Sequence, residues 1–152
     1  MPSILLPVPH YKQAGKYNCL PACARMTLDY LGISRSEAEL VRQLDATPLG
    51  TPGSRLLRLR SRRLRVAYVP FTLPLLKSQL QNQTPVIVLV RTIFLDCWQD
   101  DVAHAVVVVG YNDDHLLLND PAFDHAPQQA SLNGFLAAWG EFDFLTGLIT
   151  RR

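Results

Sequence analysis

The sequence predicts an α+β domain with helices in its first half and an antiparallel sheet in its second half. Helix-capping residues precede segments with apolar residues at three- and four-residue steps in the first half, whereas the second half contains short runs of Val, Ile and Leu. A turn-forming Asn-Asp-Asp sequence joins two of these runs. With 152 residues, of which 48% are hydrophobic, the chain can close one apolar core but not two. We therefore expect residues 1–152 to form a single domain with segregated helical and sheet layers.

The first helix is predicted to begin at Cys19 and to stop at Gly32, after an extended segment over residues 1–18. Pro21 fits a first helical turn, where its missing N–H would have no partner in any case. One apolar stripe, typical of a helix with a buried face, contains Ala22, Cys23, Met26 and Tyr30.

Two more helices are predicted from capping signals. Ser34 followed by Glu37 matches a capping box, in which each residue bonds to the backbone of the other, and this box opens a helix through about Leu44. Thr72 can cap a further helix over residues 72–81. The apolar residues of the earlier helix are Ala38, Leu40, Val41 and Leu44.

Arginines are concentrated in one short segment, although the formal net charge of the chain is only +2. We interpret this segment as a helix whose solvated face carries the arginines and whose leucines turn inward. A surface that recognises an acidic peptide or a phosphate is the alternative interpretation. The arginines are Arg55, Arg58, Arg60, Arg62, Arg63 and Arg65, and the leucines are Leu56, Leu57, Leu59 and Leu64.

The second half changes to short β-branched or apolar runs bounded by turn residues, which predicts buried strands. Asn112–Asp114 favours a tight hairpin between two of them, because Asn and Asp tolerate left-handed turn positions. Near the end of the chain we expect Ser131 to cap a helix that reaches Trp139. The predicted strands cover residues 66–71, 85–90, 105–109, 116–118 and 142–149.

Charge and cysteine content exclude several classes of protein. A net charge of +2 is too small to indicate a nucleic-acid partner, and no apolar run approaches the ~20 residues that span a bilayer. The opening segment has no basic region and is interrupted by Pro7 and Pro9, so we expect neither a signal peptide nor a membrane anchor. Because three cysteines cannot all pair within the chain, we expect a reducing, cytoplasmic location. No cofactor is expected.

Acyl transfer by a cysteine requires a thiolate, a histidine that takes and returns its proton, a group that orients the histidine, and donors for the oxyanion. Cys19 lies at a predicted helix start, where the helix dipole favours a thiolate, although unreactive buried cysteines are common. His104 opens the run 105–109, at an edge between loop and core where sites are often built. Its structural alternative is a half-buried, hydrogen-bonded histidine. We interpret Cys23 and Cys97 as structural.

Asp120 is the candidate that would orient the histidine. If strands 105–111 and 115–120 form a hairpin about Asp113, then His104 and Asp120 lie near each other at its open end. The carboxylate would then bond to the imidazole and fix its tautomer. Its structural alternative is a turn carboxylate ahead of a proline.

Gln13 is the candidate oxyanion donor, because it precedes Cys19 by six residues in an extended segment that can fold back over the helix start. A surface amide is its structural alternative. A zinc site that uses Cys19 and Cys23 with His115 and His125 is a further alternative, but this spacing is a poor match to known zinc ligand patterns.

In this order, these residues resemble the bacteriocin-processing, or double-glycine leader, cysteine peptidase family, a compact papain-like group. The family pattern is a Gln, then Cys-x-x-Ala with an apolar helix that ends in Tyr-x-Gly. Much later, a His opens a valine-rich strand that ends in Gly-Tyr, and Asp-Pro closes the next strand. The resemblance covers about residues 8 to 122. The matching residues are Gln13, Cys19, Ala22, Cys23, Met26, Tyr30, Gly32, His104, Val106 to Gly110-Tyr111, and Asp120-Pro121.

The resemblance implies a papain-like fold and a cysteine peptidase with Cys19, His104, Asp120 and Gln13 as site residues. Its substrate would be a peptide or protein, cleaved in the best-known members after a Gly-Gly that ends a leader peptide. Those members are usually fused to an ATP-driven exporter, which this sequence lacks, so a separate transporter or an acidic peptide is the expected partner.

Two other functions fit the same residues. One is a different acyl transfer, such as glutamine deamidation, transamidation or isopeptide cleavage, because these reactions use the same groups. The other is a non-catalytic peptide-binding module, for which Cys19→Ala would leave the activity in cells intact.

Overall fold

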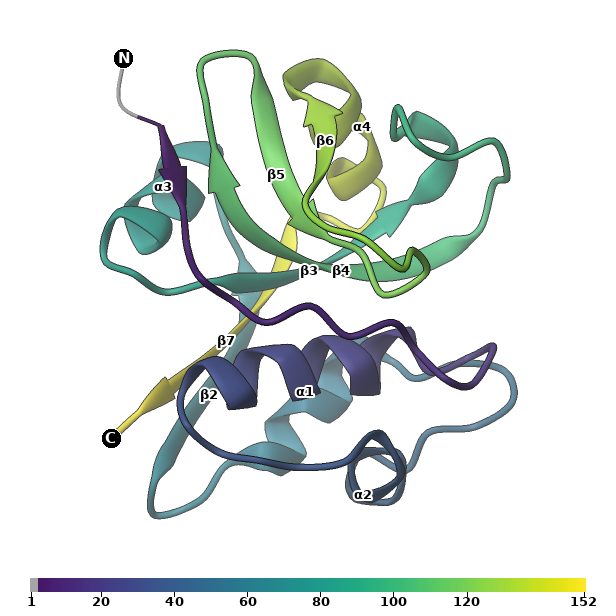
Figure 1. Ribbon diagram of the computed structural model, residues 1–152, viewed down its shortest axis with the longest axis vertical. Helices are drawn as coiled ribbons and strands as arrows, with labels where there is room; N and C mark the ends of the chain where they lie inside the picture. The colour runs from purple at the N-terminus through teal and green to yellow at the C-terminus, as the bar shows by residue number, and fades with distance from the viewer. Residues whose placement is uncertain (1–2) are drawn as a thin grey trace.

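The computed structural model describes residues 3–152, so the first two residues of the predicted extended segment lie outside the described residues. Within this range, the helices pack around one antiparallel sheet (Figure 1). The strands are β1 (Ile4–Leu5), β2 (Leu64–Pro70), β3 (Val86–Arg91), β4 (Ala103–Tyr111), β5 (His115–Asn119), β6 (Gln128–Ser131) and β7 (Leu145–Arg151). The helices are α1 (Cys19–Tyr30), α2 (Glu37–Gln43), α3 (Leu73–Gln81) and α4 (Leu132–Gly140), with 3-10 turns η1 (Gly53–Leu59) and η2 (Thr92–Phe94).

The sheet has the strand order β2-β7-β3-β4-β5-β6, and β1 pairs with the last residues of β4. Strand β4 is buried from His104 to Tyr111, as expected for a continuous apolar run covered on both faces. Gly110 lets β1 approach closely, because a Cβ there would lie 2.0 Å from the carbonyl oxygen of Ile4. In Figure 1, β2 and β7 run away from the other strands toward the C-terminus at the lower left.

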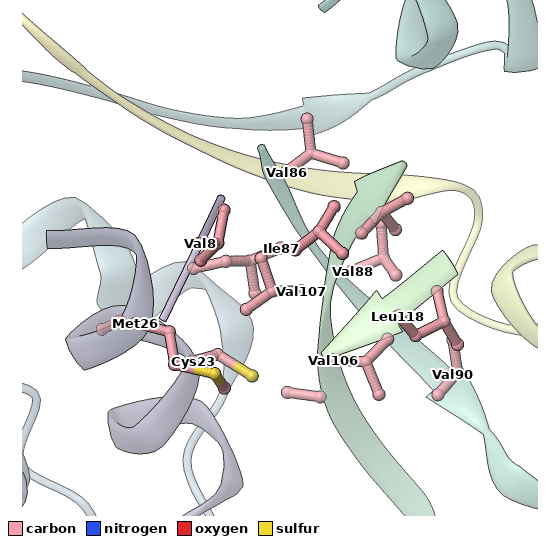
Figure 2. Close-up of a cluster of buried hydrophobic side chains, with 14 of the residues drawn as sticks. Val8, Cys23, Met26, Val86, Ile87, Val88, Val90, Val106, Val107 and Leu118 are labelled. Carbon is pink, nitrogen blue, oxygen red and sulfur yellow. The ribbon is translucent and has the colours of Figure 1, made fainter. Parts of the chain in front are cut away.

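Helix α1 has the boundaries that its sequence predicts. It ends ahead of Gly32, which adopts a left-handed φ of 82° and lets Ile33 N donate back to Leu28 O. The helix packs against β4 and β3, with Cys23 and Met26 in the core (Figure 2). This packing holds the first residue of α1 beside the start of β4.

The second helix begins two residues later than predicted. Ser36 is its N-cap: the Ser36 hydroxyl accepts from Glu39 N at 3.1 Å, and the Glu39 carboxylate accepts from Ser36 N. The predicted box of Ser34 and Glu37 is therefore wrong. The sequence offers two overlapping boxes, and the earlier one is not formed because the Glu37 carboxylate accepts hydrogen bonds from another loop.

The arginine-rich segment is not the helix predicted for residues 55–65. A 3-10 turn ends at Leu59, and the chain becomes extended at Leu64, where β2 begins. Between them, the Ser61 hydroxyl accepts from Leu64 N, a local bond that competes with helix continuation. Of the four leucines predicted to turn inward, Leu56, Leu59 and Leu64 are buried and Leu57 is partly buried.

The hairpin of β4 and β5 forms about the predicted turn, since Asn112 N donates to His115 O. The pairing of residues is not regular along this hairpin, because an irregularity between Val108 and Gly110 shifts the register of β4 against β5. The ladder ends at the pair Val107 and Asn119, so the residues beyond it are not held opposite one another by backbone bonds.

The end of the chain differs from the prediction in two details. Ser131 occupies the predicted N-cap position of α4, but its side chain makes no capping hydrogen bond, because its hydroxyl donates to the carboxylate of Asp96 in the loop before β4. The last strand begins at Leu145, because Asp143 and Phe144 adopt left-handed backbone angles in the turn before it. Helix α3 agrees with its prediction, and the Thr72 hydroxyl accepts from Leu75 N. In the part of the chain described here, no helix combines the length and the apolar character needed to cross a bilayer.

Candidate active site

Cys19 is the first residue of α1, and its side chain is partly exposed while it packs against the apolar core. The N–H groups of a first helical turn have no partner within the helix, so they present positive partial charge at this point. The position fits the sequence prediction of a reactive cysteine at a helix start.

His104 lies near the start of β4 and is only 7% exposed. Its Nε2 is 2.6 Å from Asp120 Oδ1. Because the carboxylate can only accept, Nε2 carries a hydrogen, and Nδ1 is the ring nitrogen that remains available to Cys19, which lines the same cleft. The structure therefore brings together the three side chains that the sequence singled out, although His104 and Asp120 lie beyond the ladder of their hairpin.

Asp120 is fully buried, and all of its hydrogen bonds are to groups of the site or its loop. Besides His104, it accepts from Ala122 N at 2.9 Å and from Trp98 Nε1 at 2.8 Å. The Trp98 ring also packs against the imidazole, with ring centroids 4.9 Å apart. Sequence reasoning missed Trp98, because it lies in the irregular loop between η2 and β4, where no periodicity shows which side chain turns inward.

The charges and hydrogen bonds of this cluster shift the pKa values of His104 and Cys19 in the directions that favour an ion pair. Burial opposes the charged form of His104, but the hydrogen bonds and charges of Asp120 and Cys19 outweigh burial and raise the pKa of His104 to about 9. Burial likewise opposes the Cys19 thiolate, but the hydrogen bond and charge of His104, with backbone N–H groups, lower the pKa of Cys19 below its usual value. Both shifts favour a thiolate beside an imidazolium.

The other two thiols have the opposite electrostatics. Cys23 is fully buried in the core, and burial raises its pKa well above the usual value, with the charges of Cys19 and Asp120 acting in the same direction. Burial and the charge of Asp120 raise the pKa of Cys97 to about 11. Neither thiol is activated.

Gln13 lies in the loop that leads to Cys19, and its backbone N donates to Pro121 O at 2.8 Å, next to Asp120. Its side-chain Nε2 donates to Gly15 O at 2.9 Å and to Lys16 O at 3.0 Å. Its Oε1 is buried and has no hydrogen-bond partner among residues 3–152. Both N–H groups of the amide thus bond to carbonyls of its own loop.

Glu37 holds this loop from the first turn of α2. Its carboxylate accepts from Ala14 N at 3.0 Å, from Gly15 N at 3.1 Å and from the Asn18 side chain at 3.1 Å. Asn18 is the residue immediately before Cys19. The Glu37 carboxylate therefore fixes both ends of the connection between Gln13 and the helix start. The sequence pattern predicts a capping box for Glu37 and does not indicate this role.

A cleft of about 440 Å³ opens over Cys19 and His104. One wall comes from the loop between α2 and η1, and the other from β3, β4 and the turn before β7. Over residues 3–152, no group of three or more His, Cys, Asp and Glu side chains could hold a metal ion. The cleft residues other than Cys19 and His104 are Thr47, Leu49, Gly50, Thr51, Pro52, Arg55, Leu89, Ala103, Ala105 and Phe142.

Solved structures with the same fold come from peptidases. A Bacillus anthracis protein assigned as a C39-like peptidase superposes with a TM-score of 0.80 at 16% identity, over 100% of this chain and 99% of that chain. The peptidase domain of Streptococcus ComA, a bifunctional ABC transporter of a quorum-sensing pathway, gives a TM-score of 0.77 at 18% identity, over 95% and 99%.

A double-glycine motif protease from an AMS/PCAT transporter, solved in complex with the leader peptide, gives a TM-score of 0.73 at 16% identity, over 97% of this chain and 94% of that chain. These matches confirm the predicted papain-like α+β fold. No curated protein matches the sequence. The model of the Peptidase_C39 like family matches residues 5–146, nearly the whole chain. The chain belongs to the Peptidase_C39 like family.

Proposed function

We propose that the protein is a cysteine peptidase in which Cys19 is the nucleophile, His104 the general base and acid, and Asp120 the residue that orients His104. The observation that carries the proposal is the short contact of 2.6 Å between His104 and the buried Asp120, in a cluster that lowers the pKa of Cys19. Membership in a peptidase family supports the same reaction class.

The reaction begins with the Cys19 thiolate, which attacks the carbonyl carbon of the scissile peptide bond. His104 gives its Nδ1 proton to the leaving amine, so the C–N bond breaks and a thioester to Cys19 forms. Neutral His104 then takes a proton from water, which attacks the thioester and releases the acid product and the thiolate. Asp120 keeps Nε2 protonated throughout, so Nδ1 is always the nitrogen that exchanges the proton.

The oxyanion of each tetrahedral intermediate requires donors beside Cys19. We assign the backbone N–H of Cys19 and the Nε2 of Gln13 to this role. Because Gln13 Nε2 bonds to Gly15 O and Lys16 O, one of these bonds has to be exchanged for the substrate oxygen. The buried, unpartnered Oε1 of Gln13 indicates that the amide is not fully satisfied in its present orientation.

The proposed substrate is a peptide that enters the cleft as an extended chain, cut after Gly-Gly at the end of a leader. The complex of a structurally similar protease with its leader peptide supports this substrate class. The peptidase domain of a transporter among the similar structures supports an exporter as the partner that delivers or receives the peptide. Three unpaired thiols suit a reducing cytoplasm.

A peptide-library digest tests the proposed function. The wild-type protein should generate new peptide termini, read by mass spectrometry, with a recurrent sequence before the cut. Cys19→Ala should generate none, whereas Cys97→Ala, a variant of a partly exposed thiol with a raised pKa, should cleave as the wild type does. Equal cleavage by Cys19→Ala would remove the nucleophile, and mass shifts without new termini would indicate deamidation or transamidation instead.

A further inference from the structure

Among the described residues that line the cleft, three have side chains that can carry a charge: Cys19, His104 and Arg55. Arg55 lies in η1, and its side chain is 29% exposed. The remaining cleft residues of both walls are uncharged. A guanidinium in an otherwise uncharged wall of the cleft that contains the reacting thiol is placed to interact with charged groups of a bound substrate.

One nitrogen of this guanidinium anchors it. Nη1 donates to Leu44 O at 3.2 Å, to Asp45 O at 3.0 Å and to Asp45 Oδ2 at 3.1 Å. Asp45 reaches these positions with a left-handed φ of 52°, which fixes its carbonyl and its carboxylate on the same donor. Three acceptors on one nitrogen hold the guanidinium in place before any ligand arrives.

The other edge of the guanidinium is free. Nε and Nη2 have no hydrogen-bond partner among the described residues, and their N–H groups point in parallel on the edge opposite the anchored nitrogen. Two parallel N–H donors match the two oxygens of a carboxylate, which is the most specific pairing that arginine makes. A pre-anchored fork also loses little side-chain freedom on binding.

A second group in the cleft has unused hydrogen-bonding capacity. The hydroxyl of Thr51 is buried and has no partner among residues 3–152, and Thr51 lies in the same wall as Arg55, four residues earlier. A hydroxyl beside a guanidinium fork can donate to the same anion or accept from the peptide backbone that carries it. Both groups therefore indicate a polar subsite within a mainly apolar cleft.

We propose that the Nε and Nη2 edge of Arg55 binds a carboxylate of the peptide close to the bond that Cys19 cleaves, with the Thr51 hydroxyl as a supporting contact. The inference rests on the proposed function and specifies its substrate class: peptides with a carboxylate near the scissile bond. The carboxylate belongs either to an Asp or Glu side chain or to the free C-terminus of a short peptide. Both sources offer the same two oxygens to the fork.

Alkylating probes test the subsite without a known substrate. Iodoacetyl derivatives of Asp amide and Glu amide present a side-chain carboxylate at two distances from the reacting carbon. Each is paired with the derivative of Asn amide or Gln amide, which presents the neutral isostere. Iodoacetyl glycine and iodoacetyl diglycine, each paired with its C-terminal amide, present a terminal carboxylate. In each case the Cys19 sulfur bonds to the methylene carbon, iodide leaves, and the rate constant at pH 7 is measured by mass spectrometry of the Cys19 peptide.

In at least one pair, the wild-type protein should react about tenfold faster with the carboxylate than with its amide, the size expected for a charge-assisted hydrogen bond. The preferred pair identifies the source of the carboxylate. In Arg55→Gln, the two rate constants of that pair should differ by less than about twofold. Arg55→Lys, which keeps the charge but loses the two parallel N–H donors, should give an intermediate ratio of rate constants. Arg58→Gln is the control, since Arg58 is exposed outside the cleft and should keep the wild-type ratio.

Wild-type ratios below about twofold for every pair would overturn the proposal, and this comparison needs no variant to fold. A ratio that survives in Arg55→Gln would also overturn it, because the preference would then come from the charge of His104. If neither member of any pair labels Cys19, the nucleophile itself is wrong, and the proposed function fails together with its subsite.

Discussion

The imidazole Nε2 of His104 lies 2.6 Å from the carboxylate of Asp120, and both side chains are buried. The same carboxylate accepts from Trp98 Nε1, so the imidazole is fixed by a bond to Asp120 and by ring packing against Trp98. A charge pair that is held on both sides in a buried position retains its geometry when the neighbouring thiol loses its proton. This relationship determines what the His104 and Asp120 variants below should do.

Removal of His104 should make Cys19 a poorer nucleophile at neutral pH. His104 makes the largest contribution to lowering the pKa of Cys19, so in His104→Ala only the backbone N–H groups of Leu20 and Ala105 oppose the effect of burial, and the pKa of the thiol rises. The rate of alkylation by iodoacetamide, followed from pH 5 to 11, should therefore rise at lower pH in the wild type than in the variant. Identical pH profiles would show that His104 does not act on the thiol.

The kcat/KM of the wild-type peptidase should fall at alkaline pH. The pKa of His104 is raised to about 9, so the proton that the leaving amine needs is present below that pH and is lost as the pH rises through it. The profile of kcat/KM should thus be bell-shaped, whereas alkylation, which needs no acid, should have no alkaline decline. A kcat/KM that continues to rise beyond pH 10 would contradict the assignment of His104 as the acid.

Asp120→Asn should reduce kcat by about 10³-fold or more and should also lower stability. An amide has one acceptor oxygen in place of two, so it cannot satisfy Ala122 N, Trp98 Nε1 and His104 Nε2 together. The unsatisfied donor should cost about 1–3 kcal/mol in the free energy of unfolding. Urea unfolding and steady-state kinetics on one preparation measure both effects, and a fully active Asp120→Asn protein would refute the orienting role.

Gln13→Ala should lower kcat by about 10²-fold with little change in KM, because the oxyanion contact strengthens only as negative charge develops. Alkylation of Cys19 passes through no oxyanion and should proceed at about the wild-type rate. A kcat within about twofold of wild type would leave Cys19 and His104 in their roles and would make Gln13 a loop residue whose amide merely bonds to Gly15 O and Lys16 O.

Glu37→Gln should lower kcat by about tenfold without changing which thiol is alkylated. The amide would turn a donor toward Ala14 N, Gly15 N or Asn18, so the loop between Gln13 and Cys19 would lose its fixed position. Glu39→Gln is the matched control: it lies in the same helical turn and serves the capping box of Ser36, which an amide can also form. Equal losses of kcat in the two variants would assign the effect to α2 stability.

Local signals in the sequence were sufficient for α1, α3 and the paired strands β3 to β5. Pro21, Gly32 and Thr72 act within one or two turns of their own position, so their effect can be recognised without a partner. The contact of His104 with Asp120 was predicted because a hairpin turn constrains both strands that lead to it.

The features that the sequence did not indicate depend on distant partners. Strand β1 exists because Gly110 allows the chain to approach β4, and its two residues have no pattern of their own. Trp98 donates to Asp120, which lies 22 residues later in the sequence. Arg55 lies in a 3-10 turn in place of the predicted helix and lines the cleft. Ser34 and Ser36 each begin a possible capping box, and the earlier box is not formed because Glu37 accepts a hydrogen bond from Gly15 N, 22 residues earlier in the sequence.

The most direct test of the central claim relates the modification of Cys19 to the loss of peptidase activity. Iodoacetamide is added in limiting steps at pH 7, and each sample is split between a cleavage assay and mass spectrometry of the three cysteine-containing peptides. Because only Cys19 has a lowered pKa, it should be modified first, and activity should fall in proportion, reaching zero when Cys19 is fully alkylated while Cys23 and Cys97 remain free. Full alkylation of Cys19 in a protein that still cleaves peptides would contradict the account.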